Sequence, residues 1–273
     1  MAKVVAICQV FNELEKGNLE RFFKYLKPLV DEIVIYDDAS TDGSYEYALS
    51  QTSHVIRAVK NTFTAEQFHK QQLLDYTTSL KPDFILSMDA DEVLSAGTDL
   101  QKWCTHCEQH KLDGVAFHML NLWRESAYRR TDSFFDDGYP VRLWRVGGGV
   151  SFDNPKEGLH GRLLPSQIEK TVIADDAFLL HYGFADDKNL AFKYFTYKGH
   201  GQRGYLMLDR FVDESKLTLE AVPKQEFPKG LYPAGPQPTA RTLVQSLEAL
   251  EQYRALVRRP KYSVACLIYK SVE

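Results

Sequence analysis

The chain has 273 residues, of which 44% are hydrophobic and 26% are charged, which is typical of a globular protein with a sizeable core. Its formal net charge of -4 argues against a general nucleic-acid-binding protein, because such proteins carry a basic surface. No apolar run approaches the ~18 residues of a membrane span, and 4 cysteines are too few for a secreted disulfide framework. We therefore expect a cytoplasmic protein.

The first third of the chain predicts strands and helices in alternation. Short apolar runs rich in β-branched residues predict strands at 3–11, 32–36, 55–59 and 83–88. Apolar residues at helical spacing predict helices at 18–30, through Tyr45 and Leu49, and at 64–80. Strands separated by helices pair in parallel through right-handed crossovers. We therefore expect an α/β fold with a mostly parallel central sheet flanked by helices.

The remainder of the chain is less regular. It predicts strands at 113–123, 141–146 and 177–184, and helices at 98–111, 186–203 and 242–259. Prolines recur through 223–239, which predicts an irregular linker before the last helix. We therefore expect a main domain over 1–222 and a C-terminal helical extension over 223–273, which would consist of this linker and a helix packed on the domain.

Acidic and amide side chains gather where three of the predicted parallel strands end. Asn12–Glu13 follow the first strand, Asp37–Asp38 follow the second, and Asp89, Asp91 and Glu92 follow the fourth. Ligands bind outside the carboxyl ends of the strands in such sheets. A carboxylate that loses water without gaining a partner is costly, so this edge of the sheet is a candidate site for a positively charged group.

The spacing of Asp89-Ala90-Asp91 suits a hard divalent cation. Residues two apart in an extended segment point to the same side, so the two carboxylates could hold Mg²⁺ or Mn²⁺ and leave coordination positions for phosphate oxygens. A solvated strand end is the alternative, because so short a motif is weak by itself.

Three segments together resemble the nucleotide-sugar-binding half of the family 2 glycosyltransferases, which share a Rossmann-like fold called GT-A. They are VVAICQVFNE, IVIYDDASTDGS and FILSMDADEVL, which correspond in order and separation to the family's opening strand, its Asp-Asp loop and its Asp-x-Asp loop. The resemblance is close over 3–95 and looser beyond. It implies a nucleotide-sugar-binding half over 1–95 and an acceptor half over 96–222. Ala39 stands where the family usually has glycine.

The resemblance also implies which residues bind the donor. Gln9 and Phe11 would flank the uracil or other base, and Asp38 would accept a hydrogen bond from the base or the ribose. Lys70 stands where the family often has an arginine near the donor, although a solvated helix lysine is an equally good interpretation. Asp89 would contact the donor as well as the metal.

The metal that the resemblance implies is Mn²⁺ or Mg²⁺, bound by Asp89 and Asp91 and bridging the donor diphosphate. His181, at the end of the strand expected over 177–184, would be a further ligand, because relatives place a histidine there and neutral imidazole can ligate Mn²⁺. A core histidine bonded to the backbone is the alternative.

The general base is harder to locate. Relatives carry an acid or a His-Glu pair after a strand like 141–146, and the stretch here is SFDNPKEGLHGRL, in which Gly161 follows His160. Asp153, Glu157 and His160 are the candidates. Glu157 is the first choice, because an unperturbed glutamate is ionised at neutral pH. A surface loop with ordinary charges is the alternative for each.

These features predict an inverting, divalent-metal-dependent glycosyltransferase, similar to the hexosyltransferases. It would move a sugar from a nucleotide diphosphate, with UDP favoured, to a hydroxyl of a glycan, lipid-linked or protein acceptor, for example in cell-surface glycan synthesis. Two alternatives share the fold: a nucleotidyltransferase and a non-catalytic nucleotide-sugar-binding protein.

Two further segments have other interpretations. Trp103-Cys104-Thr105-His106-Cys107 matches the WCxxC motif of thiol oxidoreductases, but it lies inside a predicted helix, so buried structural thiols are expected. The basic segment at 258–270 is expected to dock as a terminal strand, or at most to make peripheral contact with a membrane surface.

Overall fold

Strands and helices alternate along the first half of the computed structural model, which describes residues 1–62, 65–132, 135, 138–147, 150–152, 164–199 and 211–257. The strands there are β1 (Val4–Val10), β2 (Glu32–Asp37), β3 (His54–Arg57), β4 (Phe84–Ser87) and the short β5 (Glu92–Leu94). The helices are α1 (Asn18–Leu26), α2 (Ser44–Gln51), α3 (Glu66–Ser79) and α4 (Leu100–His110).

Strands dominate the second half before two helices follow. The strands are β6 (Gly114–Asn121), β7 (Tyr128–Arg130), β8 (Val141–Arg145), β9 (Thr171–His181) and β10 (Leu219–Ala221). The helices are α5 (Asp187–Gly199) and α7 (Leu243–Glu251). Short 3₁₀ turns lie at Lys27–Leu29, Lys224–Glu226 and Arg254–Leu256.

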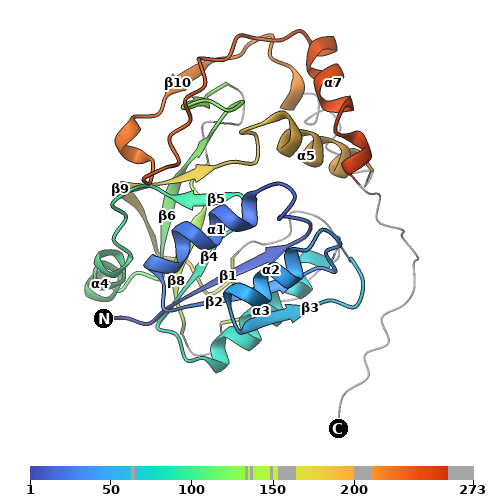
Figure 1. The fold of residues 1–273 in the computed structure, drawn as a ribbon. Coiled ribbons are helices and arrows are strands. Elements are labelled where there is room, and N and C mark those ends of the chain that lie inside the picture. The colour runs from blue at the N-terminus through green and yellow to red at the C-terminus, as the bar shows by residue number, and fades with distance from the viewer. Residues whose placement is uncertain are drawn as a thin grey trace.

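One eight-stranded sheet runs through the molecule in the order β3-β2-β1-β4-β8-β6-β9-β5 (Figure 1). The pairs β3–β2, β2–β1, β1–β4 and β6–β9 are parallel, whereas β8 and β5 run antiparallel to their neighbours. The predicted α/β fold with a mostly parallel sheet is confirmed. Val10 lies beside Asp37 and Ile7 beside Ser87, so the carboxyl ends of β1, β2 and β4 meet at one edge.

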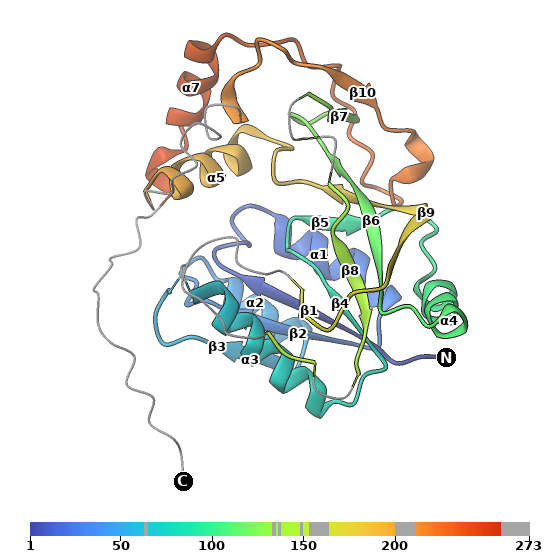
Figure 2. The same ribbon diagram turned by 180° about the vertical axis from the view of Figure 1, so that it is seen from behind.

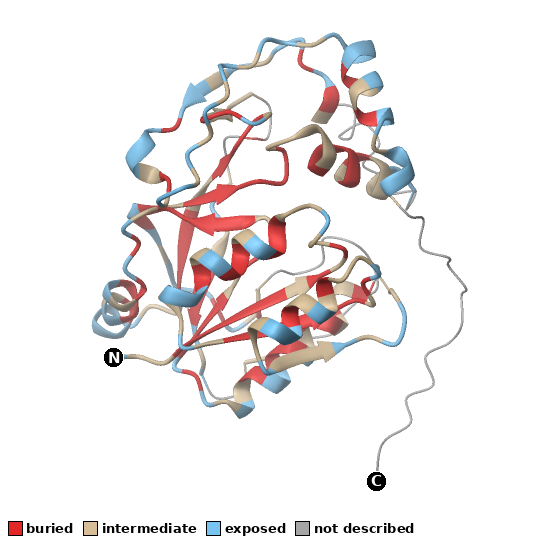
Figure 3. Cartoon of the chain, in the orientation of Figure 1, coloured by how far each residue is buried: buried red, intermediate tan, exposed pale blue. Residues whose placement is uncertain are grey.

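Helices cover both faces of this sheet, as the opposite views in Figure 1 and Figure 2 show. Phe22 of α1 and Trp103 of α4 pack in one cluster with Ala6 of β1, whereas Leu74 of α3 packs with Ile7 of β1 in another. Successive residues of a strand point to opposite faces, so a strand covered on both faces must be apolar almost throughout, as β1 (VVAICQV) is. Figure 3 shows the resulting concentration of buried residues in the sheet.

The structure differs from the sequence prediction in the second half. The strand expected at 177–184 already begins at Thr171, because Thr171–Ile173 pair with the first residues of β6. The helix expected over 242–259 ends at Glu251, and the last residues of the helix expected over 186–203 lie outside the described residues. The sequence did not predict the three-residue strands β5, β7 and β10, since a segment that short has no periodicity of its own.

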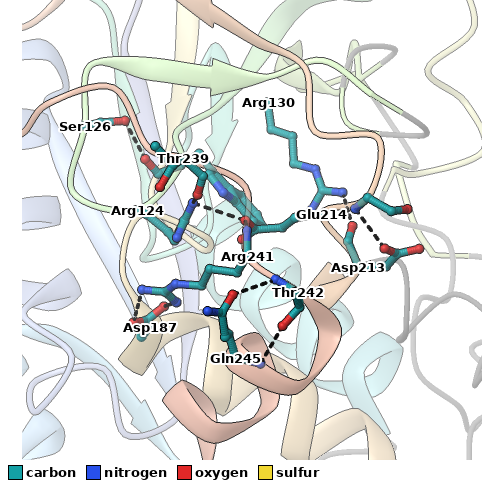
Figure 4. Close-up of polar contacts among 12 residues, drawn as sticks. Arg124, Ser126, Arg130, Asp187, Asp213, Glu214, Thr239, Arg241, Thr242 and Gln245 are labelled. Atoms are coloured by element: carbon teal, nitrogen blue, oxygen red, sulfur yellow. Dashed lines mark hydrogen bonds and ion pairs between the residues drawn. The ribbon is translucent and has the colours of Figure 1, made fainter.

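The segment after β10 returns across the molecule to α5, and polar contacts fasten it there (Figure 4). The Arg241 guanidinium donates to both carboxylate oxygens of Asp187, at 2.6 and 3.0 Å, and the Arg241 backbone N–H donates to Glu214 at 2.7 Å. Leu250 of α7 packs in one apolar cluster with Leu190 of α5. These contacts fix the position of α5 against the C-terminal segment.

None of the helices in the described ranges combines the length and the hydrophobicity that a bilayer span requires. The basic segment at 258–270 lies outside those ranges.

Candidate active site

A cleft of about 400 Å³ opens at the carboxyl ends of β1, β2 and β4. Side chains from these strand ends, from α3 and α5 and from the start of β8 line it. Of the residues expected to bind donor or metal, it contains Gln9, Phe11, Asp38, Lys70, Asp89, Asp91 and His181. The tertiary structure therefore brings together residues that lie as far apart in sequence as β1 and β9. The three candidate bases, Asp153, Glu157 and His160, lie outside the described residues.

The acidic segment after β4 forms a turn. The Glu92 N–H donates to the Asp89 carbonyl at 3.0 Å, and the Glu92 carboxylate accepts from the Asp89 N–H at 2.9 Å. Asp89 and Asp91 therefore lie in a turn and not in the expected extended segment, and both line the cleft. The two carboxylates have different partners.

Asp89 and Glu92 both bind the guanidinium of Arg142, the second residue of β8. Arg142 donates to Asp89 at 2.9 Å and makes a short contact with Glu92. Arg142 and Glu92 are almost completely buried, whereas the Asp89 side chain is 57% exposed to the cleft. Burial raises the pKa of Glu92 to about 8, although Arg142 opposes the shift. At neutral pH Glu92 is therefore mostly protonated, and Arg142 becomes its counterion as the pH rises through about 8.

Asp91 faces His181 at the end of β9. Asp91 Oδ2 lies 3.3 Å from His181 Nε2, because β5 and β9 pair with Glu92 opposite His181. On the other side of the ring, His181 Nδ1 lies 2.6 Å from the Asn121 amide oxygen. The Asn121 amide nitrogen donates to the Phe135 carbonyl at 2.7 Å, which fixes the orientation of the amide. His181 therefore carries its proton on Nδ1 and turns the Nε2 lone pair toward Asp91.

The charges around Asp91 support this assignment. Burial lowers the pKa of His181, which keeps the ring neutral, and Asp91 offsets part of that shift. Burial favours a neutral Asp91, but the Lys193 ammonium outweighs it and holds the pKa of Asp91 well below its usual range. The Lys193 ammonium, from α5, lies 3.0 Å from Asp91 Oδ2. Asp91 is consequently an ionised carboxylate beside a neutral imidazole.

Asp38 also lines the cleft and is completely buried. Its carboxylate accepts from the Asn61 side chain at 2.9 Å and from the Thr62 N–H at 3.0 Å. Burial raises the pKa of Asp38 to about 7, against the effect of the Thr62 hydrogen bond. A carboxyl with a pKa near neutrality can exchange a proton when a ligand binds.

Gln9 and His69 form a hydrogen-bonded chain next to Asp38. The Gln9 amide nitrogen lies 2.9 Å from His69 Nδ1, and His69 Nε2 lies 2.8 Å from the Thr62 hydroxyl. Burial lowers the pKa of His69 to about 4, so the ring is neutral and can accept from Gln9. This arrangement leaves the Gln9 amide oxygen buried without a hydrogen-bond partner. A buried acceptor without a partner is costly, and a donor group on a ligand would satisfy it.

The loop after β2 explains why the family usually has glycine at position 39. Ala39 adopts φ 57°, in the left-handed region that favours glycine. Asn12, also at positive φ, accepts from the Thr41 N–H at 2.8 Å through its side chain. This bond ties the loops after β1 and β2 together, which agrees with a loop-shaping role for Asn12.

Each lysine or arginine side chain that lines the cleft in the described part of the chain is paired with a carboxylate. The pairs are Lys16–Glu13, Lys70–Glu66, Arg142–Asp89 and Lys193–Asp91. The positive charges that line the cleft are therefore already paired, and an anionic ligand would have to replace their carboxylate partners.

Sequence reasoning missed Arg142, Lys193, Asn121 and His69. A basic residue within the apolar run VRLWRV was a usable signal for Arg142, because a buried arginine requires an acidic partner. Lys193, on a helix of ordinary composition, gave no comparable signal.

The cysteines of the WCxxC segment behave as structural thiols. Cys104 and Cys107 lie buried on α4 in the cluster under the sheet. Burial raises the pKa of Cys104 to about 12 and that of Cys107 to about 11, so neither forms the thiolate that redox chemistry needs at neutral pH.

The chain thus has a mostly parallel α/β sheet with a charged cleft at its strand ends, which is where folds of this class bind their ligands. The model of the family described as "Glycosyl transferase family 2" matches residues 6–144, just over half of the chain. The chain therefore belongs to glycosyl transferase family 2. No curated protein matches the chain.

Solved structures resemble it at a distance. The S. aureus TarS structure matches with a TM-score of 0.47 and 13% identity, covering 78% of this chain and 42% of that chain. A TarS structure of residues 1–349 with UDP-GlcNAc has a TM-score of 0.45 and 13% identity, covering 78% of this chain and 71% of that one. Glucosyl-3-phosphoglycerate synthase from Mycobacterium tuberculosis, with Mn²⁺ and UDP-glucose, has a TM-score of 0.31 and 16% identity, covering 43% of this chain and 44% of that one. The chain thus spans less than half of TarS and of the synthase.

Proposed function

We propose that this member of the family is an inverting, divalent-metal-dependent glycosyltransferase that takes a sugar from a nucleotide diphosphate, with UDP favoured, and passes it to a hydroxyl acceptor. The observation that carries the proposal is the Asp91–His181 pair, which turns a carboxylate oxygen and an imidazole lone pair toward each other in the cleft. We further propose that the donor-binding half of the domain comprises residues 1–95 and that the acceptor half comprises residues 96–222.

The pair fits a divalent ion such as Mn²⁺. Two ligand atoms lie about 3 Å apart when bonds of about 2.1 Å meet at a right angle, and Asp91 Oδ2 and His181 Nε2 are 3.3 Å apart. No group of three or more His, Cys, Asp or Glu side chains converges within the described ranges. Two protein ligands are sufficient where phosphate oxygens and water complete the shell. When bound, the ion would neutralise charge on the leaving diphosphate.

The chain's own residues would position the donor. Lys70 and Lys193 can exchange their carboxylate partners for diphosphate oxygens, because both ammonium groups line the cleft. The unpartnered Gln9 oxygen is placed to accept a hydrogen bond from the base, and Asp38 to accept one from the base or the ribose. Phe11 also lines the cleft and would offer an apolar face.

The general base would remove the proton of the acceptor hydroxyl on the face of the sugar opposite the leaving group. Glu157 remains the first candidate, with Asp153 and His160 as the others. A Glu157→Gln variant should still bind nucleotide and lose sugar transfer.

Calorimetric titration of UDP, with Mn²⁺ and with EDTA, tests the proposal. UDP is the nucleotide that the resemblance favours. We expect binding that requires Mn²⁺ and that Asp91→Asn abolishes. Asp175→Asn, on the exposed surface of β9, is the matched control and should bind as the wild type does. Absence of UDP binding under all conditions would remove the UDP assignment.

Turnover separates the enzyme from a non-catalytic binding protein. A panel of UDP-sugars, assayed for UDP release with and without candidate acceptors, should show hydrolysis or transfer in the wild type and none in Glu157→Gln. UDP binding without any turnover would instead support the binding protein.

A further inference from the structure

Lys193 occupies the space between the two groups that could bind a metal. Its ammonium lies 3.0 Å from Asp91 Oδ2 and 3.5 Å from His181 Nε2. The ammonium is thus within reach of both the carboxylate and the imidazole lone pair.

Gly183 marks the same space independently. A Cβ placed on Gly183 would lie 2.6 Å from Asp91 Oδ2 and 2.6 Å from His181 Nε2. The point is therefore equidistant from both candidate ligand atoms. The same Cβ would lie still closer to the Cε of Lys193, so the lysine side chain passes through this space. Glycine leaves room beside the pair, and Lys193 fills that room.

Arg142, the cation beneath the cleft floor, does not occupy the space beside Asp91 and His181. Arg142 contacts Asp89 and Glu92 instead of Asp91. Lys193 is therefore the one positively charged side chain found against Asp91 in the described part of the molecule.

We propose that Lys193 holds the divalent-cation position in the donor-free protein and gives it up when metal and nucleotide diphosphate bind together. The inference rests on the proposed function for the identity of the ligands. A metal ion alone must displace the ammonium from its carboxylate, and two cations cannot share that carboxylate without strong repulsion. A diphosphate removes this obstacle, because it offers the displaced ammonium a new anionic partner. Metal binding should therefore be weak alone and strongly coupled to nucleotide binding.

Mn²⁺ binding in the absence of nucleotide tests the inference directly, by loss of the free-ion electron paramagnetic resonance signal. Lys193→Met keeps the length of the side chain and removes the charge, and we expect it to bind Mn²⁺ at least about tenfold more tightly than the wild type. Lys193→Arg keeps the charge and should bind weakly. Lys198→Met is the matched control, since it removes an exposed lysine from the same helix, and should equal the wild type.

Asp91→Asn in the Lys193→Met background should cancel the gain, which would assign the bound ion to this position. Near-ultraviolet circular dichroism would establish that each variant is folded. If folded Lys193→Met bound Mn²⁺ no more tightly than the wild type, or if the gain survived Asp91→Asn, the inference would be wrong.

Failure of the proposed function has a different signature. In that case the wild type would bind no UDP in any condition, whereas the Mn²⁺ gain in Lys193→Met would still support the role of Lys193. Conversely, metal-dependent UDP binding by the wild type with unchanged Mn²⁺ affinity in Lys193→Met would refute the role of Lys193 alone.

Discussion

The ion pair beneath the cleft floor allows a quantitative prediction about stability. Arg142→Met removes the charge but keeps most of the apolar stem, so packing changes little. Glu92, of which 2% is exposed, then loses its counterion. The contact with Asp89 contributes less, because the Asp89 side chain is 57% exposed and solvent screens the pair. The effect of the substitution should therefore follow the ionisation of Glu92.

The magnitude depends on pH in a defined direction. The pKa of Glu92 is raised to about 8 in the folded protein, above its unfolded value, so its contribution to stability is lost as the pH rises through that value. Without Arg142 the pKa rises further. At pH 6.5 Glu92 is protonated in both proteins, and the variant should lose about 1–3 kcal/mol for the missing hydrogen bonds. Above pH 8 the loss should grow by up to about 1.4 kcal/mol for each pH unit.

Urea-induced unfolding, followed by tryptophan fluorescence at pH 6.5 and pH 9, measures both quantities. Arg145→Met, on the exposed end of the same strand, is the control and should change the free energy of unfolding by less than about 0.5 kcal/mol. Glu92→Gln together with Arg142→Met should abolish the pH dependence of the loss. A loss in Arg142→Met that is equal at both pH values would refute the reasoning, because it would mean that Glu92 is not the group left without a counterion.

Three further predictions concern the cleft and the thiols. Burial lowers the pKa of His69 to about 4, below its value in the unfolded chain, so acid favours the unfolded chain. The free energy of unfolding should therefore fall by about 2 kcal/mol between neutral pH and pH 5 through His69 alone. His69→Gln should remove this acid sensitivity in urea titrations. Asn121→Leu should weaken Mn²⁺-dependent UDP binding by about tenfold or more, because His181 loses the partner that sets its tautomer; unchanged calorimetric affinity would argue against that tautomer. Cys104→Ser with Cys107→Ser should leave UDP binding intact, and loss of transfer in the folded double variant would revive the thiol alternative.

Local sequence pattern was sufficient to predict the strands of the first third of the chain. β1, β2, β3 and β4 lie within two residues of their predicted ends, because each is a short apolar run bounded by polar residues and joined to the next by a helix. The second half depends on pairing between distant segments. β5 has three residues and exists because it pairs with the end of β9, which no local pattern reveals.

Some features of the candidate site could likewise be predicted from the sequence, and others depend on the tertiary structure. The sequence by itself determined that Asp38, Asp89 and Asp91 gather at one sheet edge, because the ends of parallel strands must meet there. It also suggested His181, through resemblance. Only the tertiary structure decided the partners of these acids. In the turn after β4, Asp89 and Asp91 have different partners, and Arg142 reaches Asp89 from 53 residues away. Lys193 reaches Asp91 because α5 is held over the end of β9. Charge pairing depends on distances of a few ångströms, and packing between elements far apart in the chain sets those distances.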